Sequence, residues 1–348
     1  MTNINISNLI YGVAVGDAMG FPVQFYKREQ VKSFNVTKMI PHKGGKFPAG
    51  TWSDDTSLTL ALADSLSQTD DIDYSDIMKK FYNWISKGEY TQEGKAFDIG
   101  RTCFKALLNY SSGVDPLMCG GQGENENGNG SLMRLAPLVF YIQKKYGDSA
   151  FDNKDTFDVI HNVSRLTHAH PIALVGCDIY IAVLFALLHG MEKDAALKFA
   201  IEKVSPYVQT YPELKKAIAK YQRLTKDDFI NLPETKISSS GYVVDTLEAA
   251  LWCFLTTDSY RECILQAVNL GKDTDSIAAV SGAMAGLYYG NSEEKGIPEE
   301  WKCALQNKNL IEIIITKFEI RFIAFLFDLC YTVNNRRCKC LTIQSLKK

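Results

Sequence analysis

The chain has 348 residues, enough for one large domain or two small ones, and 46% of them are apolar, as is ordinary for a protein with a substantial core. Its formal net charge of -2 argues against a protein that binds nucleic acid through bulk electrostatics. Nine scattered cysteines, and an N-terminal stretch without the layout of a signal peptide, predict a cytoplasmic protein with free thiols.

A first helix is expected at about residues 7–20. It carries a glycine at every fourth position: Gly12, Gly16 and Gly20. Such a stripe removes side chains from one face and lets another backbone approach, although each glycine costs a helix about 1 kcal/mol relative to alanine. Asp17 falls on the buried side, where it is either an acid satisfied by backbone donors, which the residues alone favour, or a support for a nearby site. Gln24 follows in the turn.

The turn Trp52-Ser53-Asp54-Asp55-Thr56 follows a loop-like stretch, 35–51, and leads into an expected helix at about 57–67. Ser and Asp are preferred at helix starts because they bond free backbone N–H groups, so a well-capped helix is one interpretation. A cap needs only one such residue, however, and adjacent carboxylates repel unless a cation or a proton lies between them. This turn is therefore a candidate metal or acid–base site.

A glycine- and asparagine-rich stretch, Cys119 to Gly130, follows helices expected at about 74–86 and 97–110. Ahead of a helix that opens at Ser131, such a loop can bring backbone N–H groups close to an anion such as a phosphate. It lacks the lysine of a Walker motif and the strand–loop–helix setting of a Rossmann fingerprint. A flexible surface loop is an equally good interpretation of these residues alone.

His168 and His170 follow a helix expected at about 154–166. With no Cys or third His nearby they are a weak metal site, but they could hydrogen-bond a polar ligand. The apolar run 172–188 is shorter than the ~20 residues that span a bilayer and contains Asp178, so we expect a buried helix and no membrane span. Further helices are expected at about 193–203, 211–223, 243–256 and 259–269.

A second acidic turn, Asp273-Thr274-Asp275-Ser276, precedes a helix expected at about 275–289. That helix has its own stripe of small residues: Ala278, Gly282 and Gly286. Two turns rich in carboxylates and hydroxyls suggest one shared site of oxygen ligands, a chemistry that suits Mg²⁺ or Mn²⁺. Four crowded acids would need about two divalent ions to balance their charge. Whether the two turns meet in space cannot be read from the residues.

No run shows the alternation of a β-strand, so the chain is predicted to be all-α, a compact single-domain helical bundle. We expect one domain over residues 1–335 and a solvated basic tail over 336–348. The run 311–333 is expected to be an amphipathic helix, because charged residues interrupt its apolar face.

Five stretches in this order together resemble the ADP-ribosylglycohydrolase family. They are Gly12 to Pro22, Trp52 to Thr56, Gly128 to Arg134, Thr167-His168 and Asp273 to Ser276. Each would be weak alone, but five ordered motifs across residues 10–290 make the resemblance specific. It implies an all-α domain with two Mg²⁺ (or Mn²⁺) ions at the base of a cleft. It also implies hydrolysis of the glycosidic bond between ADP-ribose and an acceptor, often a protein side chain.

The resemblance also implies roles for individual residues. The metal ligands would be Ser53, Asp54, Asp55, Asp273, Asp275 and Ser276. The loop holding the diphosphate and its ribose would be Asn125, Glu126, Asn127, Gly128, Asn129, Gly130 and Ser131. His168 would hydrogen-bond the ligand, Tyr242 would lie near the adenine, and Asp17 would support the metal-binding turn. Asp54 or Asp55 would orient a water or carry a proton.

Gln24 departs from the pattern, because the family usually has Glu at this position. Glutamine keeps the shape and an acceptor oxygen but loses the negative charge and the ability to exchange a proton, so residue 24 would act in catalysis with reduced effect. The leading hypothesis is a hydrolase that releases ADP-ribose from a modified protein or other acceptor, with arginine-linked substrates favoured over serine-linked ones. The alternatives are an ADP-ribose-binding protein with weakened or lost turnover, and a metal-dependent hydrolase of another ADP-ribosyl compound.

Overall fold

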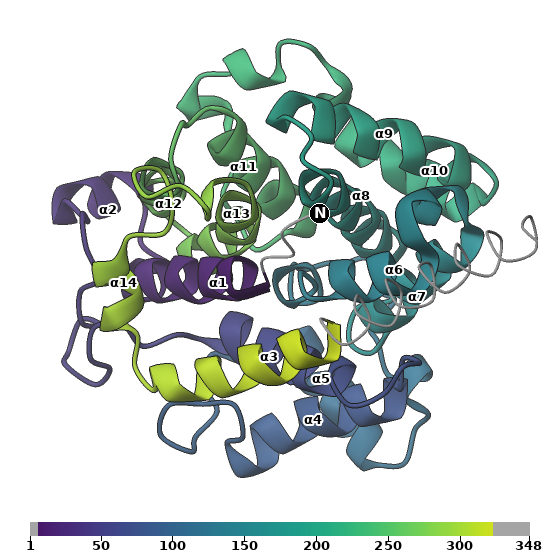
Figure 1. Ribbon diagram of the computed structural model, residues 1–348, viewed down its shortest axis with the longest axis horizontal. Helices are drawn as coiled ribbons and strands as arrows, with labels where there is room; N and C mark the ends of the chain where they lie inside the picture. The colour runs from purple at the N-terminus through teal and green to yellow at the C-terminus, as the bar shows by residue number, and fades with distance from the viewer. Residues whose placement is uncertain (1–5, 323–348) are drawn as a thin grey trace, which may run out of the picture.

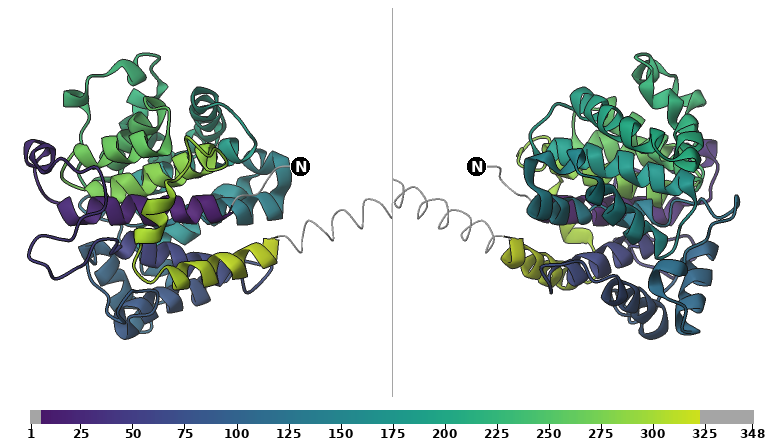
Figure 2. Two further views of the ribbon diagram at one scale, coloured as in Figure 1. Left: turned by 60° about the vertical axis from the view of Figure 1, so that its left-hand side comes forward. Right: turned by 90° about the vertical axis from the view of Figure 1, so that its right-hand side faces the viewer.

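Helices account for the regular structure of the chain, and no strand occurs in the part described, residues 6–322 of a computed structural model. The α-helices are α1 (Ile6–Gly20), α2 (Arg28–Phe34), α3 (Asp54–Leu66), α4 (Tyr74–Lys87), α5 (Arg101–Ser111), α6 (Leu138–Tyr146), α7 (Lys154–Arg165), α8 (Pro171–Leu188), α9 (Lys193–Gln209), α10 (Pro212–Ile218), α11 (Val243–Leu255), α12 (Tyr260–Asn269), α13 (Thr274–Tyr289) and α14 (Glu299–Ala304). Residues 308–322 form a further helix beneath α1 (Figures 1 and 2). The predicted all-α fold is confirmed, while the basic tail lies outside the described residues.

The two small-residue stripes face one another where α1 packs against α13, its most extensive helix contact (Figure 1). A Cβ placed on Gly12 would collide with the carbonyl of Gly282, and one on Gly16 would collide with the carbonyl of Ala278. A Cβ on Gly20 would collide in the same way with the carbonyl of Thr274. The glycines therefore bring the C-terminal end of α1 and the acidic N-terminal end of α13 together.

The apolar run predicted to be buried forms α8, which lies among the other helices (Figure 1). Both α8 and the N-terminal segment Ile6–Val23 have the length and hydropathy of a membrane span, and 89% of each is buried within the protein. Within α8, Asp178 accepts a 2.8 Å contact from the imidazole Nε2 of His161 on α7. Burial of its apolar surface explains α8 as a core helix.

The structure differs from the expected elements in two places that matter for the site. The helix expected at 97–110 begins only at Arg101, so Asp98 lies in a loop and has a left-handed backbone, with φ of 62°. Ser131 opens only a short 3₁₀ turn, Leu132–Arg134, and the regular helix α6 starts at Leu138. Periodicity alone does not locate such boundaries, because the flanking residues continue the same pattern.

Candidate active site

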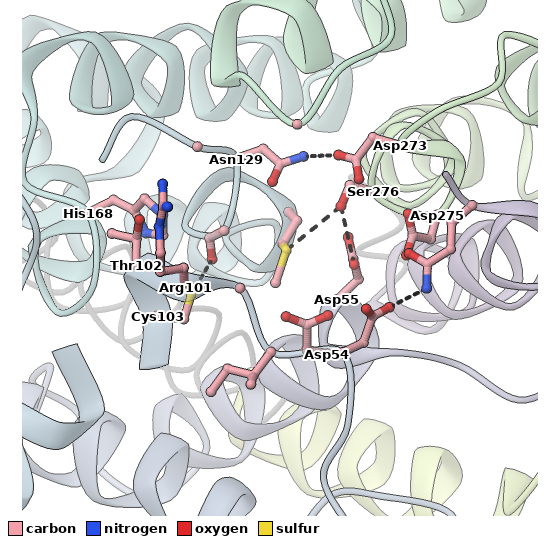
Figure 3. Close-up of a pocket in the computed structure, with 18 of the residues that line it drawn as sticks. Asp54, Asp55, Arg101, Thr102, Cys103, Asn129, His168, Asp273, Asp275 and Ser276 are labelled. Atoms are coloured by element: carbon pink, nitrogen blue, oxygen red, sulfur yellow. Dashed lines mark hydrogen bonds between the residues drawn. The ribbon is translucent and has the colours of Figure 1, made fainter. Parts of the chain in front are cut away.

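Three helices begin at one cavity of about 430 Å³ (Figure 3). The first residues of α3, α5 and α13 line it: Asp54, Asp55, Arg101, Thr102, Cys103, Asp275 and Ser276. The rest of the wall includes Gln24, Asp98, Asp273, His168 and the glycine-rich loop. Helix N-termini present free N–H groups and the positive end of the helix dipole, which favours acidic side chains and anionic ligands there.

The turn that starts α3 is hydrogen-bonded to the buried carboxylate of Asp17. Both carboxylate oxygens of Asp17 accept from the N–H of Ser53 at 2.9 Å, and Oδ2 also accepts from the N–H and hydroxyl of Thr56, at 3.0 and 2.6 Å. Asp17 is thus a buried acid satisfied largely by backbone donors, and its position beneath the turn also suits a supporting role. Burial raises its pKa to about 6 despite these bonds.

The two acidic turns meet, as the hypothesis of a shared site requires. Asp55 Oδ2 accepts from the hydroxyl of Ser53 at 3.0 Å and from the hydroxyl of Ser276 at 3.3 Å, which joins α3 to α13. Asp273 accepts from the amide of Asn129 at 2.5 Å, so the second turn also contacts the glycine-rich loop (Figure 3). Ser53 itself caps α3 and does not line the cavity.

The acids at this site share a strained electrostatic environment. Burial raises the pKa values of Asp54, Asp55 and Asp275 well above the ordinary range, and neighbouring carboxylates raise each of them further. Burial also raises the pKa of Asp273 to about 6, against the opposing effect of its hydrogen bond from Asn129. Keeping all of these buried carboxylates ionised is therefore costly unless cations bind between them or some of them take up protons.

The donor set fits a hard divalent cation. Carboxylate and hydroxyl oxygens are the ligands that Mg²⁺ prefers, and Oδ1 of Asp55 and Oδ1 of Asp275 are buried without a hydrogen-bond partner. Within residues 6–322, no three Asp, Glu, His or Cys side chains already converge as a formed metal centre. The predicted ligands line this cavity or, in the case of Ser53, contact one that does. Binding of a cation would require their carboxylates to turn toward it.

The glycine-rich loop is pinned at both ends of its cavity-facing part. At one end, Gly121 exchanges backbone hydrogen bonds with the segment at His168, through Thr167 O at 2.9 Å and Ala169 N at 2.8 Å. At the other, Asn129 N donates to Gly241 O at 3.0 Å. The loop is thus an ordered wall, and the residues of it that line the cavity are Asn125, Gly128, Asn129 and Gly130.

Three predicted loop residues have other positions. Glu126 braces the loop, since its carboxylate accepts from the N–H of Gly123 at 2.9 Å and pairs with Lys105 at 2.6 Å. Ser131 is fully buried and accepts from the hydroxyl of Ser164 at 2.8 Å, while the carbonyl of Asn127 accepts from Val243 N at 3.1 Å. None of the three lines the cavity.

The two predicted ligand-contact residues beyond the loop differ in position. His168 lines the cavity, and burial lowers its pKa to about 3, so its imidazole is neutral near pH 7 and suited to hydrogen bonding. Tyr242 is half-buried and pairs with Gly128 through an isolated bridge, just outside the cavity wall.

Sequence reasoning missed Asp98. Gln24, which is buried, donates from Nε2 to Asp98 Oδ2 at 2.7 Å, and Asp98 lines the cavity beside Asp54 and Asp275. Burial raises the pKa of Asp98, while the bond from Gln24 lowers it. The one sequence signal was an acid shortly before Gly100 at a helix start, and assigning residue 98 to the helix concealed it.

Fold and site together define an all-α protein with an acid-lined ligand cavity at converging helix N-termini. Residues 5–328 match the family model described as ADP-ribosylglycohydrolase, and the chain therefore belongs to that family. It is 33% identical over 296 residues to the ADP-ribosylarginine hydrolase Tri1 of Pseudomonas putida, covering 84% of this chain and 71% of that protein. It is also 27% identical to the ADP-ribosyl-[dinitrogen reductase] glycohydrolase of Rhodospirillum rubrum, covering 85% and 88%. A solved ADP-ribosylglycohydrolase-related protein complex matches with a TM-score of 0.71 and 29% identity, covering 91% of this chain and 98% of that one.

Proposed function

We propose that this chain is a metal-dependent hydrolase that releases ADP-ribose from a modified acceptor, with arginine-linked protein substrates favoured over serine-linked ones. The observation that carries the proposal is the hydrogen bond between Ser276 and Asp55, which joins the two acidic turns at a cavity that the glycine-rich loop and His168 also line. Relatives named as an ADP-ribosylarginine hydrolase and as an ADP-ribosyl-[dinitrogen reductase] glycohydrolase support both the reaction class and the preference for arginine.

The two ends of the cavity match the two ends of such a substrate. Backbone N–H groups of the glycine-rich loop and the start of α5 suit the anionic diphosphate, and neutral His168 suits a hydroxyl or carbonyl partner. Asp275 lies on the opposite side of the view from His168 in Figure 3, and the ribose that carries the acceptor would be held there, between Asp275 and Asp54. The acceptor would then leave past Gln24.

The residues that would hold the cations are Ser53, Asp54, Asp55, Asp273, Asp275 and Ser276. When bound, Mg²⁺ or Mn²⁺ would supply Lewis-acid polarisation of ribose hydroxyls and of a water. The unpartnered oxygens of Asp55 and Asp275 support this assignment, because a buried anionic oxygen without a partner is costly.

The chain's own side chains would perform the remaining steps. Hydrolysis breaks the bond from the anomeric carbon to the acceptor atom; the water oxygen bonds to that carbon, and a proton passes to the leaving acceptor. Asp54 lines the cavity and has a raised pKa. It would orient the water or take its proton, and Asp55 would assist.

One observation favours a second candidate, an ADP-ribose-binding protein with little turnover. The position near the acceptor end that could hold an acid is Gln24, whose amide is committed to Asp98 and cannot exchange a proton. The same pocket would then hold ADP-ribose without cutting the bond.

The two candidates separate in one experiment. ADP-ribose release from arginine-linked and serine-linked proteins is measured with Mg²⁺, beside calorimetric binding of free ADP-ribose. Release from the arginine-linked substrate supports the hydrolase, whereas binding without release from either substrate contradicts it and leaves the binding protein.

A further inference from the structure

Phe25 is an unusual residue at the rim of the cavity. It follows buried Gln24 directly, it is 75% exposed, and it is one of the residues that line the cavity. Its φ is 64°, in the left-handed region that a bulky side chain rarely adopts. A large aromatic ring is thus held in solvent, at an unfavourable backbone conformation, beside the acidic end of the site.

Hydrogen bonds fix the backbone at Phe25, and with it the place at the rim from which the ring projects. Phe25 N donates to Lys272 O at 2.5 Å, and Lys272 N donates to Tyr26 O at 2.7 Å. Lys272 is itself left-handed, with φ of 62°, and directly precedes Asp273. These backbone hydrogen bonds, which involve two left-handed residues, therefore connect the segment after Gln24 to the second acidic turn. Such strain persists only where surrounding structure imposes it, and it concentrates at ligand sites.

The cavity that Phe25 lines is rich in carboxylates, whereas the nearby Lys272 is exposed and does not line it. Asp98 is the third left-handed residue here, and its hydrogen bond to Gln24 places its carboxylate at the same end as Asp54 and Asp275. Arg101, the one Lys or Arg among the described cavity-lining residues, is on the His168 side of the view in Figure 3, and Asp275 is on the opposite side. An aromatic ring at the rim of a cavity lined by carboxylates suits a planar cation, because the ring quadrupole and the acids both attract it.

We propose that Phe25 determines acceptor specificity by stacking its ring on the guanidinium of an ADP-ribosylated arginine. The inference rests on the proposed hydrolase function and adds a residue that would distinguish acceptors. An arginine acceptor stays planar and cationic after modification, whereas a serine acceptor offers the ring neither a plane nor a charge. Phe25 would therefore contribute to arginine-linked substrates alone.

The test removes the ring and keeps the turn. Phe25→Asn suits a left-handed position, because asparagine tolerates it, and Phe25→Tyr keeps an aromatic face. We measure kcat and KM on an ADP-ribosylated arginine peptide, the dissociation constant of free ADP-ribose, and the thermal midpoint. Met118→Asn, which removes a 65% exposed side chain away from the cavity, is the matched control.

Phe25→Asn should lower kcat/KM for the arginine peptide roughly three- to tenfold, through KM, while ADP-ribose affinity and thermal midpoint stay unchanged. Phe25→Tyr and Met118→Asn should match the parent chain. Unchanged kinetics in Phe25→Asn, or an equal loss of affinity for free ADP-ribose, would overturn the proposal. If the parent chain cleaves no substrate, the proposed function fails by itself; the same comparison, made on peptide affinity against ADP-ribose affinity, then decides the role of Phe25.

Discussion

The side-chain amide of Gln24 donates to Asp98 Oδ2 at 2.7 Å, and this bond joins a buried residue after α1 to a left-handed loop residue before α5. The glutamine therefore has a structural partner that a glutamate at the same position would repel while both were charged. Asp98 is close enough to Asp54 and Asp275 to raise their pKa values. A glutamate in place of Gln24 would therefore add a negative charge to this group of three carboxylates.

Replacing Gln24 by Glu should increase the rate of ADP-ribose release. If residue 24 lies near the scissile bond, as we propose, a carboxyl group there could exchange a proton; a positioned acid or base contributes typically 10²–10⁴-fold, so we expect kcat to rise at least about tenfold. Steady-state release from an arginine-linked substrate measures it. Gln24→Met, which removes the bond to Asp98 without adding charge, is the control and should not be faster. A Gln24→Glu variant no faster than the parent would rule the hypothesis out.

The contact between α1 and α13 should be intolerant of a single methyl group. In Gly12→Ala the new Cβ meets the carbonyl of Gly282 on a rigid backbone, so we expect a loss of about 3 kcal/mol in the free energy of unfolding. Gly100→Ala is the matched control, because Gly100 has a φ of -64° and open space around it. Denaturant unfolding compares them. Equal stability of the two variants would contradict the close packing.

Stability without divalent cations should fall as the pH rises. The raised folded-state pKa values of Asp17 and Asp273 contribute stability below the unfolded value of 3.8, and that contribution is lost as the pH rises through about 6. Asp54, Asp55 and Asp275 act in the same direction. If Mg²⁺ binds the ionised carboxylates, as we propose, the difference in thermal midpoint between Mg²⁺ and EDTA should widen from pH 5 to pH 8.

Substitution of one cavity acid separates this effect from general salt stabilisation. Asp275→Asn should raise the midpoint in EDTA, since it relieves repulsion, and should shrink the gain from Mg²⁺. Asp70→Asn, which changes an exposed acid elsewhere, should leave that gain intact. A gain from Mg²⁺ that does not depend on pH or on Asp275 would place the cation outside the cavity.

Most of the fold follows from local patterns in the sequence. The glycine stripes predicted a close backbone contact, and the structure shows each stripe to be the partner of the other. The buried helix α8 follows from its apolar run with one acid inside it. Helix boundaries near Asp98 and Ser131 did not follow, because capping and left-handed loop residues depend on tertiary contacts.

The site was only partly predictable for a similar reason. The two acidic turns could be recognised as oxygen-rich, but their meeting through Asp55 and Ser276 depends on how α1 brings α13 beside α3. Phe25 and Asp98 carried no motif, and their left-handed backbones exist only in the folded chain. The roles of the residues in catalysis and metal binding stay predictions.

The most direct test of the central claim is ADP-ribose release from an arginine-linked protein, measured in Mg²⁺ and in EDTA for the parent chain and for Asp54→Asn. If the acidic cavity is the catalytic centre, the parent releases ADP-ribose in Mg²⁺ and loses that activity in EDTA, and Asp54→Asn is at least about 10²-fold slower while it stays folded. Release by the parent that is equal in Mg²⁺ and EDTA, or unaffected by Asp54→Asn, would contradict the account.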